Sequence, residues 1–203
     1  MFDRQLRLVS TRILTPLVRG PLASANPSAL TVLGGVMGVA AAGAAARSSF
    51  LLALGLWLAN RLIDGLDGLV ARSNGGGSDA GGYLDMTVDV AVYALLPLGV
   101  AAGVDQDHRW VAAALLLASF YFNTITWTYL SSIQEKWGRG AAATAESTAI
   151  TMPVGLVEGA ETIVFFTFML SVPSLATATM FAMAALVTFG ATYRFVAGWR
   201  QIQ

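Results

Sequence analysis

Hydrophobic residues dominate long stretches of this chain, and short polar breaks divide them into segments long enough to cross a membrane. A transmembrane helix needs roughly 20 apolar residues. The pattern predicts six, at about 29–47, 51–72, 80–103, 110–132, 150–171 and 175–197. The breaks carry turn signals, such as the run Ser73-Asn74-Gly75-Gly76-Gly77-Ser78. We therefore expect an all-α fold, a polytopic membrane bundle of six transmembrane helices.

Residues 1–24 follow another pattern, in which arginines alternate with aliphatic residues at near-helical spacing. A basic amphipathic helix of this kind would lie along an anionic membrane surface; the alternative is a partly disordered basic tail. Arg12 and Arg19 enclose only six residues, too few for the apolar core of a signal peptide. We expect one domain over 1–203, with an amphipathic juxtamembrane helix at 1–24 and the six-helix bundle at 25–200.

Composition supports a membrane protein and excludes several functions. Of the 203 residues, 56% are hydrophobic and 12% charged, and the mean hydropathy is +0.65, unlike a soluble domain. The formal net charge is zero, so nothing indicates nucleic-acid binding. The sequence has no cysteine, which excludes disulfides and thiolate metal sites. His108, the only histidine, falls in a predicted loop and is expected to be a solvated bystander.

Basic residues are distributed unevenly between the two ends of the predicted spans. If the N-terminus is cytoplasmic, the opposite side holds Arg47 and Arg109, and Arg61 lies inside a span. The cytoplasmic side then holds nine basic residues: Arg4, Arg7, Arg12, Arg19, Arg72, Lys136, Arg139, Arg194 and Arg200. The positive-inside rule therefore predicts that both termini are cytoplasmic.

Four aspartates interrupt the second and third apolar segments: Asp64, Asp67, Asp85 and Asp89. Spacings of three and four residues place each pair on one helix face. Ionisable side chains at membrane depth are costly and usually mark a function. A set of interhelical hydrogen bonds would leave several buried charges unpaired, whereas bound cations would neutralise them. The oxygen-only ligand set suits Mg²⁺ or Mn²⁺, and two such ions could clamp a pyrophosphate.

The spacing D-x2-D-G-x2-A-R-x8-G-x3-D-x3-D, from Asp64 to Asp89, resembles the signature of the CDP-alcohol phosphotransferases, and every fixed position is filled. Members of that family are membrane enzymes that cleave a CDP-linked donor and pass its phosphoryl-alcohol part to a second alcohol. The resemblance implies that Asp64, Asp67 and Asp85 are the principal metal ligands. It also implies that Asp89 lies close to the metals and acts as the catalytic base.

The small and basic residues of the motif have expected roles of their own. Gly68 removes bulk where a nucleotide would approach, and Ala71 keeps that groove narrow. Arg72 could hold phosphate oxygens or could be a snorkelling arginine that sets topology. In the family the glycine and the arginine contact the CDP part, which the resemblance carries to Gly68 and Arg72. Ser78 is a further candidate for phosphate, and Asp79 is expected to be the N-cap of the third span.

The stretch Asn26-Pro27-Ser28-Ala29-Leu30-Thr31 opens the first span. Proline near a helix start is ordinary geometry, but the stretch also resembles the family's Pro-Asn-x-x-Thr entry with the first two residues exchanged. Because that segment lines the donor pocket in relatives, the resemblance implies four donor-binding candidates: Ala29, Leu30, Thr31 and Val32.

Glu158 and Glu161 interrupt the fifth apolar segment, three residues apart on one predicted helix face. They could line the acceptor pocket and favour a neutral polyol or an amino alcohol, or they could pair with Arg61 or Arg194. Basic candidates for the acceptor pocket are Lys136, Arg139 and Arg194. These cations would attract a phosphorylated alcohol or simply set topology, so the sequence leaves the acceptor open.

The chain is thus predicted to transfer a phosphatidyl group from a CDP-linked donor to a small polar alcohol, in phospholipid biosynthesis. The expected donor is CDP-diacylglycerol, because the site would open between spans at the membrane face. The expected location is a bacterial or archaeal cytoplasmic membrane, with the active site on the cytoplasmic side.

Three alternatives stay open. A soluble CDP-alcohol that donates to a lipid alcohol uses the same signature. A non-enzymatic divalent-cation transporter would also carry intramembrane carboxylates, although it has no need for the glycine, alanine and arginine at fixed distances. Gly34 and Gly38 have small-x3-small spacing, which fits either packing within one subunit or a homodimer.

Overall fold

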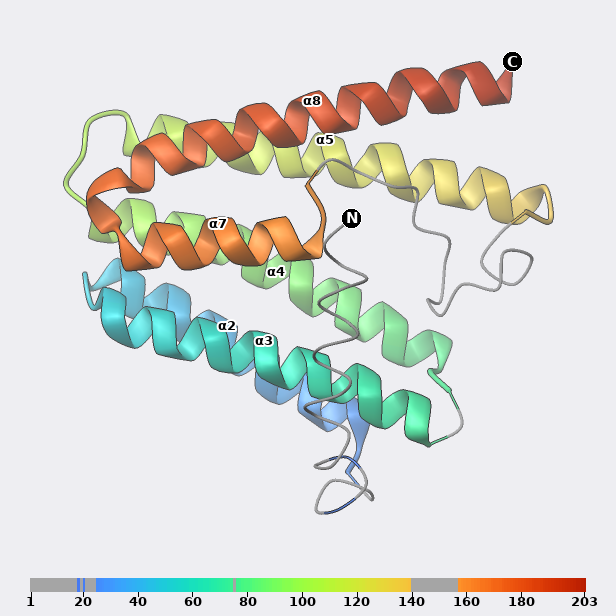
Figure 1. Ribbon diagram of the computed structural model, residues 1–203, viewed down its shortest axis with the longest axis horizontal. Helices are drawn as coiled ribbons and strands as arrows, with labels where there is room; N and C mark the ends of the chain where they lie inside the picture. Colours follow the sequence, from blue (N-terminus) through green and yellow to red (C-terminus); the bar gives the residue numbers. More distant parts are fainter. Residues whose placement is uncertain (1–17, 19, 21–24, 75, 140–156) are drawn as a thin grey trace.

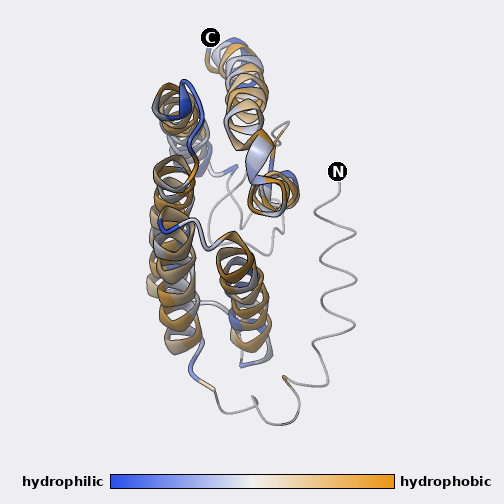
Figure 2. Cartoon of the chain, turned by 90° about the vertical axis from the view of Figure 1, so that its left-hand side faces the viewer, coloured by the Kyte–Doolittle hydropathy of each residue, from blue (hydrophilic) through white to orange (hydrophobic). Residues whose placement is uncertain are grey.

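The computed structural model describes residues 18, 20, 25–74, 76–139 and 157–203, and within these ranges the chain contains helices and no β-strand. The described helices are α2 (Pro27–Ala46), α3 (Phe50–Ser73), α4 (Asp79–Gly103), α5 (Arg109–Lys136), α7 (Gly159–Ser171), the short 3-10 helix η1 (Pro173–Leu175) and α8 (Ala176–Ile202). They run roughly side by side, with α2 and α3 at one edge and α5 and α8 at the other (Figure 1). An end-on view separates them into two layers (Figure 2). The all-α prediction is confirmed for these residues.

The observed helix bounds follow the predicted spans, with two differences. α2, α3 and α4 agree with prediction within two residues, but α5 and α8 continue to residues 136 and 202 instead of 132 and 197. α7 begins at Gly159, although its span was predicted from 150. The residues of the predicted fifth span before 157 lie outside the described residues, as does the predicted amphipathic helix apart from residues 18 and 20.

The start of α7 corrects the predicted setting of Glu158 and Glu161. Glu158 has an extended backbone and is the N-cap of α7, so the two glutamates stand at a helix start rather than inside a span. The backbone N–H of Glu158 donates to Glu161 Oε2 at 3.0 Å, in a capping box. Such a box satisfies backbone N–H groups that a helix start leaves without partners. Local capping therefore explains both carboxylates at this position.

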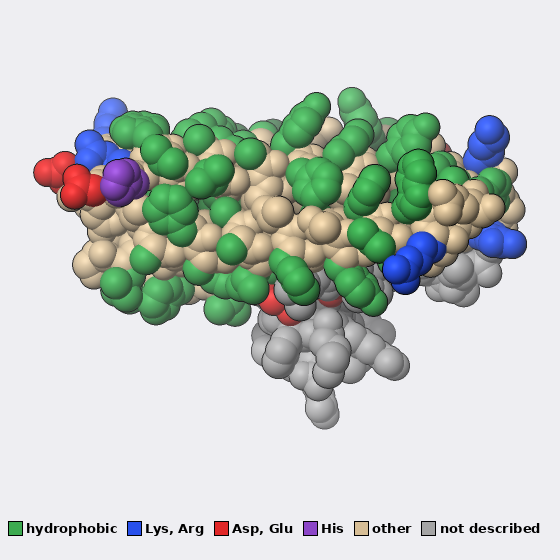
Figure 3. Space-filling view, turned by 90° about the horizontal axis from the view of Figure 1, so that it is seen from above, with side chains coloured by type: hydrophobic (Ala, Val, Ile, Leu, Met, Phe, Trp, Pro, Cys, Tyr) green, Lys and Arg blue, Asp and Glu red, His purple; other side chains and the backbone are tan. Residues whose placement is uncertain are grey.

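Four of the described helices are long and apolar enough to cross a membrane: α2, α4, α5 and the stretch Pro173–Ile202 that contains α8. α3 has 24 residues but carries Arg61, Asp64 and Asp67, and α7 has 13 residues. A helix of that length extends about 20 Å, against roughly 30 Å of hydrocarbon. Hydrophobic side chains are spread over the face seen in Figure 3, and charged side chains gather mainly at its two ends, with a few acidic ones near the middle of the lower edge. This distribution is that of an integral membrane protein.

An aromatic cluster holds α3, α4 and α7 together. The rings of Trp57 and Phe166 are fully buried, with centroids 5.3 Å apart. Tyr93 of α4 meets Phe166 edge-on at 5.7 Å, and the indole N–H of Trp57 donates to Thr167 Oγ1 at 3.1 Å. Such ring pairs contribute about 0.5–1.5 kcal/mol beyond their buried area. The cluster therefore stabilises the relative position of the two helices that carry the aspartates.

Glycines allow α2 to approach α4 and α3 closely. A Cβ at Gly99 would overlap the carbonyl of Ala42, and one at Gly38 would overlap the side chain of Val92. Gly34 faces α3, where Asn60 Nδ2 donates to the Gly34 carbonyl at 2.8 Å. Of the two alternatives for Gly34 and Gly38, the structure shows packing within one subunit.

Gly99→Ala is expected to destabilise the protein, because α2 and α4 would have to separate to admit the methyl group. Overpacking of this kind costs about 1–3 kcal/mol. Gly43→Ala is the matched control, since a Cβ there meets nothing within 4 Å; it should stabilise by about 0.5–1 kcal/mol through the helix preference of alanine. Thermal unfolding in detergent micelles measures both. Equal melting temperatures would contradict the close packing of α2 on α4.

Candidate metal centre and active site

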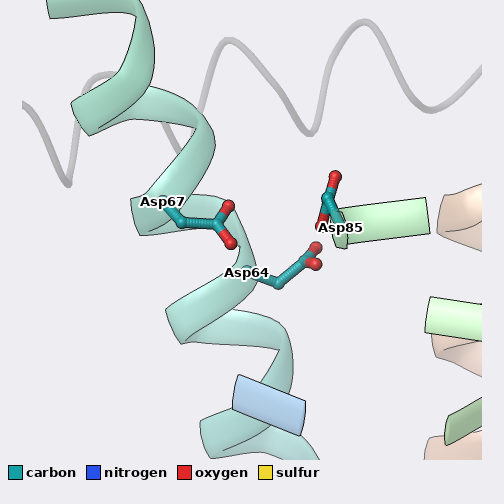
Figure 4. Close-up of side chains that lie close together, drawn as sticks. All are labelled: Asp64, Asp67 and Asp85. Carbon is teal, nitrogen blue, oxygen red and sulfur yellow. The ribbon is translucent and has the colours of Figure 1, made fainter. Parts of the chain in front are cut away.

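Three of the four predicted aspartates converge. Asp64 and Asp67 project from α3 and Asp85 from α4, and their carboxylates point toward one another (Figure 4). Each offers a ligand oxygen, and these oxygens all lie within 4.8 Å of one another. Asp67 is buried, whereas Asp64 and Asp85 are partly accessible. Closely spaced carboxylate oxygens are the ligands that a hard divalent cation requires, so the residues fit the predicted metal.

Thr31 adds a contact from α2. Its hydroxyl is buried and donates to Asp67 Oδ2 at 2.6 Å. A hydrogen bond to a metal-binding carboxylate fixes its orientation. The other donor-binding candidates of this stretch differ in setting: Ala29 and Val32 are exposed, and Leu30 is half-buried. The structure thus brings Thr31 to the carboxylates and places Ala29 and Val32 on the outside of α2.

Asp89, the fourth predicted aspartate, lies against Arg61 and is outside the group of three. Arg61 Nη2 donates to Asp89 Oδ1 at 2.7 Å, and Arg61 Nη1 lies 3.5 Å from Asp64 Oδ2. The charged partners of Arg61 among the described residues are therefore aspartates, not the glutamates at the start of α7. The contact of Arg61 with these aspartates was not predicted from the sequence. Its position one turn before Asp64 could have indicated the contact, because residues three apart share one helix face.

The arginine of the motif folds back along α3. A Cβ at Gly68 would lie 3.2 Å from Arg72 Nη1, so the guanidinium covers the glycine. Arg72 is exposed and Ala71 half-buried. The absence of a side chain at Gly68 thus leaves room for the guanidinium of Arg72 at the C-terminal end of α3. A guanidinium in that place can bind phosphate oxygens.

Ser78, not Asp79, is the N-cap of α4, which corrects the prediction. Ser78 has an extended backbone, and its Oγ accepts a hydrogen bond from the Gly81 backbone N–H at 3.1 Å. Asp79 is the first helical residue, where a carboxylate is favourable to the helix dipole. The hydroxyl of Ser78 can still donate while its oxygen caps the helix.

The acceptor-pocket candidates fall into two places. Lys136 ends α5, and Arg139 follows it with its guanidinium 5.8 Å from the Trp137 ring centroid. Arg194 of α8 is buried instead, and its Nη1 donates to Asn123 Oδ1 at 2.8 Å.

Arg194 also interacts electrostatically with Glu158 at the start of α7. Its Nε is buried and has no hydrogen-bond partner among the described residues. Of the two arginines considered as partners for the glutamates, Arg194 is the one within electrostatic range of Glu158.

The helical membrane fold and its aspartate centre define a class of transferases, and the chain belongs to the CDP-alcohol phosphatidyltransferase family, whose model matches residues 24–197. It is thus a membrane transferase of phospholipid biosynthesis. The inner membrane protein YnjF of Escherichia coli (strain K12) is 34% identical to it over 141 residues, which are 70% of this chain and 67% of YnjF.

Solved structures of phosphatidylinositol phosphate synthase from Mycobacterium tuberculosis share the fold. The one with CDP-DAG bound has a TM-score of 0.71 and 22% identity, and the match covers 93% of this chain and 94% of that one. The one in complex with manganese and citrate has a TM-score of 0.70 and 22% identity over 94% and 88% of the two chains.

Proposed function

We propose that this protein transfers a phosphatidyl group from CDP-diacylglycerol to a small polar alcohol and releases CMP. The observation that carries the proposal is that the carboxylates of Asp64 and Asp67 on α3 and of Asp85 on α4 lie close together. The helix α3 also carries Arg72. CDP-DAG bound to the synthase of the same fold supports a lipid donor. The exposed apolar side chains of the bundle support a site that a lipid reaches from the membrane.

The three converging carboxylates would hold Mg²⁺ or Mn²⁺, in a pair of ions as in other two-metal centres, and the ions would supply charge stabilisation for the pyrophosphate. Thr31 keeps Asp67 oriented toward that centre. Arg72 binds phosphate oxygens of the CDP part, Gly68 leaves room for its guanidinium, and the small side chain at position 71 leaves space for the nucleotide.

Asp89 is the base in this proposal. Its carboxylate accepts the proton of the acceptor hydroxyl, and that oxygen forms a bond to the β-phosphorus of the donor while the bond from phosphorus to the CMP oxygen breaks. A positioned general base contributes about 10²–10⁴-fold to a rate.

The proposal includes a six-span topology with both termini in the cytoplasm, in which α7 is the described part of the fifth span. α3 fits a span because two of its charged side chains face inward, Arg61 at 7% and Asp67 at 5% exposure, while Asp64 at 33% belongs to the metal centre. The basic residues at the ends of α3, α5 and α8 lie at the end of the bundle where α4 begins, so the positive-inside rule puts the aspartates toward the cytoplasm. The orientation is tested by labelling intact cells at lysine or at an introduced cysteine, because only groups on the outer side should react. Sedimentation in detergent tests whether the protein is a homodimer.

CMP release is the direct test of function. The purified protein is incubated with Mg²⁺ or Mn²⁺, with CDP-diacylglycerol or a soluble CDP-alcohol as donor, and with a panel of alcohols. CMP formed from CDP-diacylglycerol together with a new phospholipid, seen by mass spectrometry, supports the proposal. CMP from the soluble donor and diacylglycerol would reverse the direction of transfer. Manganese flux into proteoliposomes, with no CMP released from any combination of donor and acceptor, would instead identify the protein as a cation transporter.

The negative charge of Glu158 acts on Arg194, which favours an acceptor without a phosphate group. Glu158 offsets the charge of Arg194, the buried cation of the acceptor candidates, and a carboxylate repels phosphate. Neutral polyols and amino alcohols are therefore expected to react faster than phosphorylated alcohols.

Glu158→Gln should shift the preference toward phosphorylated alcohols by about fivefold, because removing one charge that acts on Arg194 is worth about 1 kcal/mol. Glu161→Gln is the matched control, since it disturbs the same capping box. The ratio of kcat/KM for glycerol 3-phosphate to that for glycerol measures the preference. An equal change of this ratio in both variants would show that it comes from the disturbed capping box of α7 and not from the charge of Glu158.

A further inference from the structure

Arg61 is a buried cation that no position of the family motif accounts for. It stands on α3 one turn before Asp64, and its side chain is 7% exposed. A buried charge within a membrane bundle is costly unless it is paired and hydrogen-bonded. Its presence next to the metal centre therefore calls for a function.

The guanidinium of Arg61 is held on every side. Nη2 donates to Asp89 Oδ1 at 2.7 Å, Nη1 donates to the Tyr93 hydroxyl at 3.1 Å, and Nε donates to Asn60 Oδ1 at 2.8 Å. The group also lies 4.8 Å from the Trp57 ring centroid and 5.3 Å from that of Tyr93. A planar group with fixed hydrogen bonds and two flanking rings has one orientation.

Asn60 extends this support into α2. The Asn60 side chain is 1% exposed, and it uses its amide N–H to hold the Gly34 carbonyl while its oxygen accepts from Arg61. Arg61 is therefore anchored by α2 and α3, and it presents Nη2 to a carboxylate of α4.

We propose that Arg61 is the positioning residue for Asp89: it holds one carboxylate oxygen of Asp89 and keeps this side chain apart from the three metal-binding aspartates. Oδ1 is bound to Arg61, so Oδ2 is the oxygen for the acceptor hydroxyl. The proposal rests on the function of Asp89 as base. It explains why Asp89 stays outside the cluster formed by Asp64, Asp67 and Asp85.

Two substitutions separate positioning from plain structural support. Arg61→Lys keeps the charge but loses the planar donor set, and Tyr93→Phe keeps the ring but loses the hydroxyl that holds Nη1. We expect kcat to fall about 10–100-fold in Arg61→Lys, which is part of the roughly 10²–10⁴-fold contribution of a well-placed general base. In Tyr93→Phe it should fall about threefold, as for one neutral hydrogen bond. KM for CDP-diacylglycerol and the affinity for Mn²⁺ should change less than about twofold, because lysine keeps a positive charge beside Asp64 and the three metal-binding aspartates are themselves unchanged.

The control is Arg109→Lys, which alters an arginine paired with an exposed aspartate, Asp105, at 2.9 Å. An exposed pair contributes little, so kcat should stay at the wild-type value. Unfolding temperatures of all three variants are recorded in the same detergent.

The outcomes are distinct. A lower kcat with unchanged KM and Mn²⁺ affinity supports positioning. Unchanged kcat in both Arg61→Lys and Tyr93→Phe, with only a lower unfolding temperature, would show a structural ion pair and overturn this inference alone. A fall in Mn²⁺ affinity would place Arg61 in the metal centre and overturn it as well. A wild-type protein that releases no CMP would overturn the proposed function and this inference with it.

Discussion

Asp85→Asn is expected to abolish phosphatidyl transfer, with CMP release at least about 10³-fold below wild type. Charge stabilisation by a metal centre is worth several kcal/mol, and each 1.36 kcal/mol is a factor of about ten in rate. Asp85 is the member of the cluster that α4 contributes, so its loss leaves the two carboxylates of α3 without their partner across the helix interface. The neutral amide keeps the size of the side chain but removes its charge.

Metal binding and turnover should fail together in Asp85→Asn. Electron paramagnetic resonance of Mn²⁺ gives the affinity, and CMP release over a Mn²⁺ titration gives the rate; we expect the affinity to weaken by more than about tenfold. Asp79→Asn is the control, because Asp79 is an exposed carboxylate on the first turn of the same helix. Wild-type Mn²⁺ affinity in Asp85→Asn would remove Asp85 from the metal centre.

Asp89→Asn should lower kcat by about 10²–10⁴-fold, which is the contribution of a general base. Its affinity for Mn²⁺ should stay close to that of the wild type. The reason is geometric: Asp89 is bound to Arg61, and the group of three carboxylates close enough to share an ion does not include it. The amide of asparagine cannot accept the proton of the acceptor hydroxyl as a carboxylate does. CDP-diacylglycerol and Mn²⁺ should therefore still bind while transfer stops.

The comparison of Asp89→Asn with Asp85→Asn distinguishes base from ligand. Mn²⁺ affinity and kcat are measured for both variants under the same conditions. Near-normal turnover in Asp89→Asn would end its assignment as base. A loss of Mn²⁺ affinity equal to that of Asp85→Asn would make Asp89 a fourth ligand, as the family resemblance also allows.

The start of α7 illustrates why some local features could not be read from the sequence. Hydropathy averages over about 20 residues, so Glu158 and Glu161 looked like interruptions of a longer apolar segment. In the structure they form a capping box, in which Glu158 is the N-cap and Glu161 lies in the first turn of the helix. Likewise Ser78 rather than Asp79 caps α4. Serine and aspartate can both adopt the extended backbone of an N-cap, so residue type alone does not show which of the two is the cap.

The sequence by itself determined the positions of the helices and of the aspartates on them, since apolar length and three- or four-residue spacing are properties of one segment. It placed Asp64 with Asp67 on α3 and predicted that Asp85 would join them. Only the tertiary structure decided which side chains of different helices meet. Arg61 reaches Asp89 and not a glutamate because the crossing of α3 and α4, fixed by the close approach of α2 and by the aromatic cluster, sets which faces are in contact. Helix rotation and crossing depend on packing across the whole bundle, and no single segment encodes them.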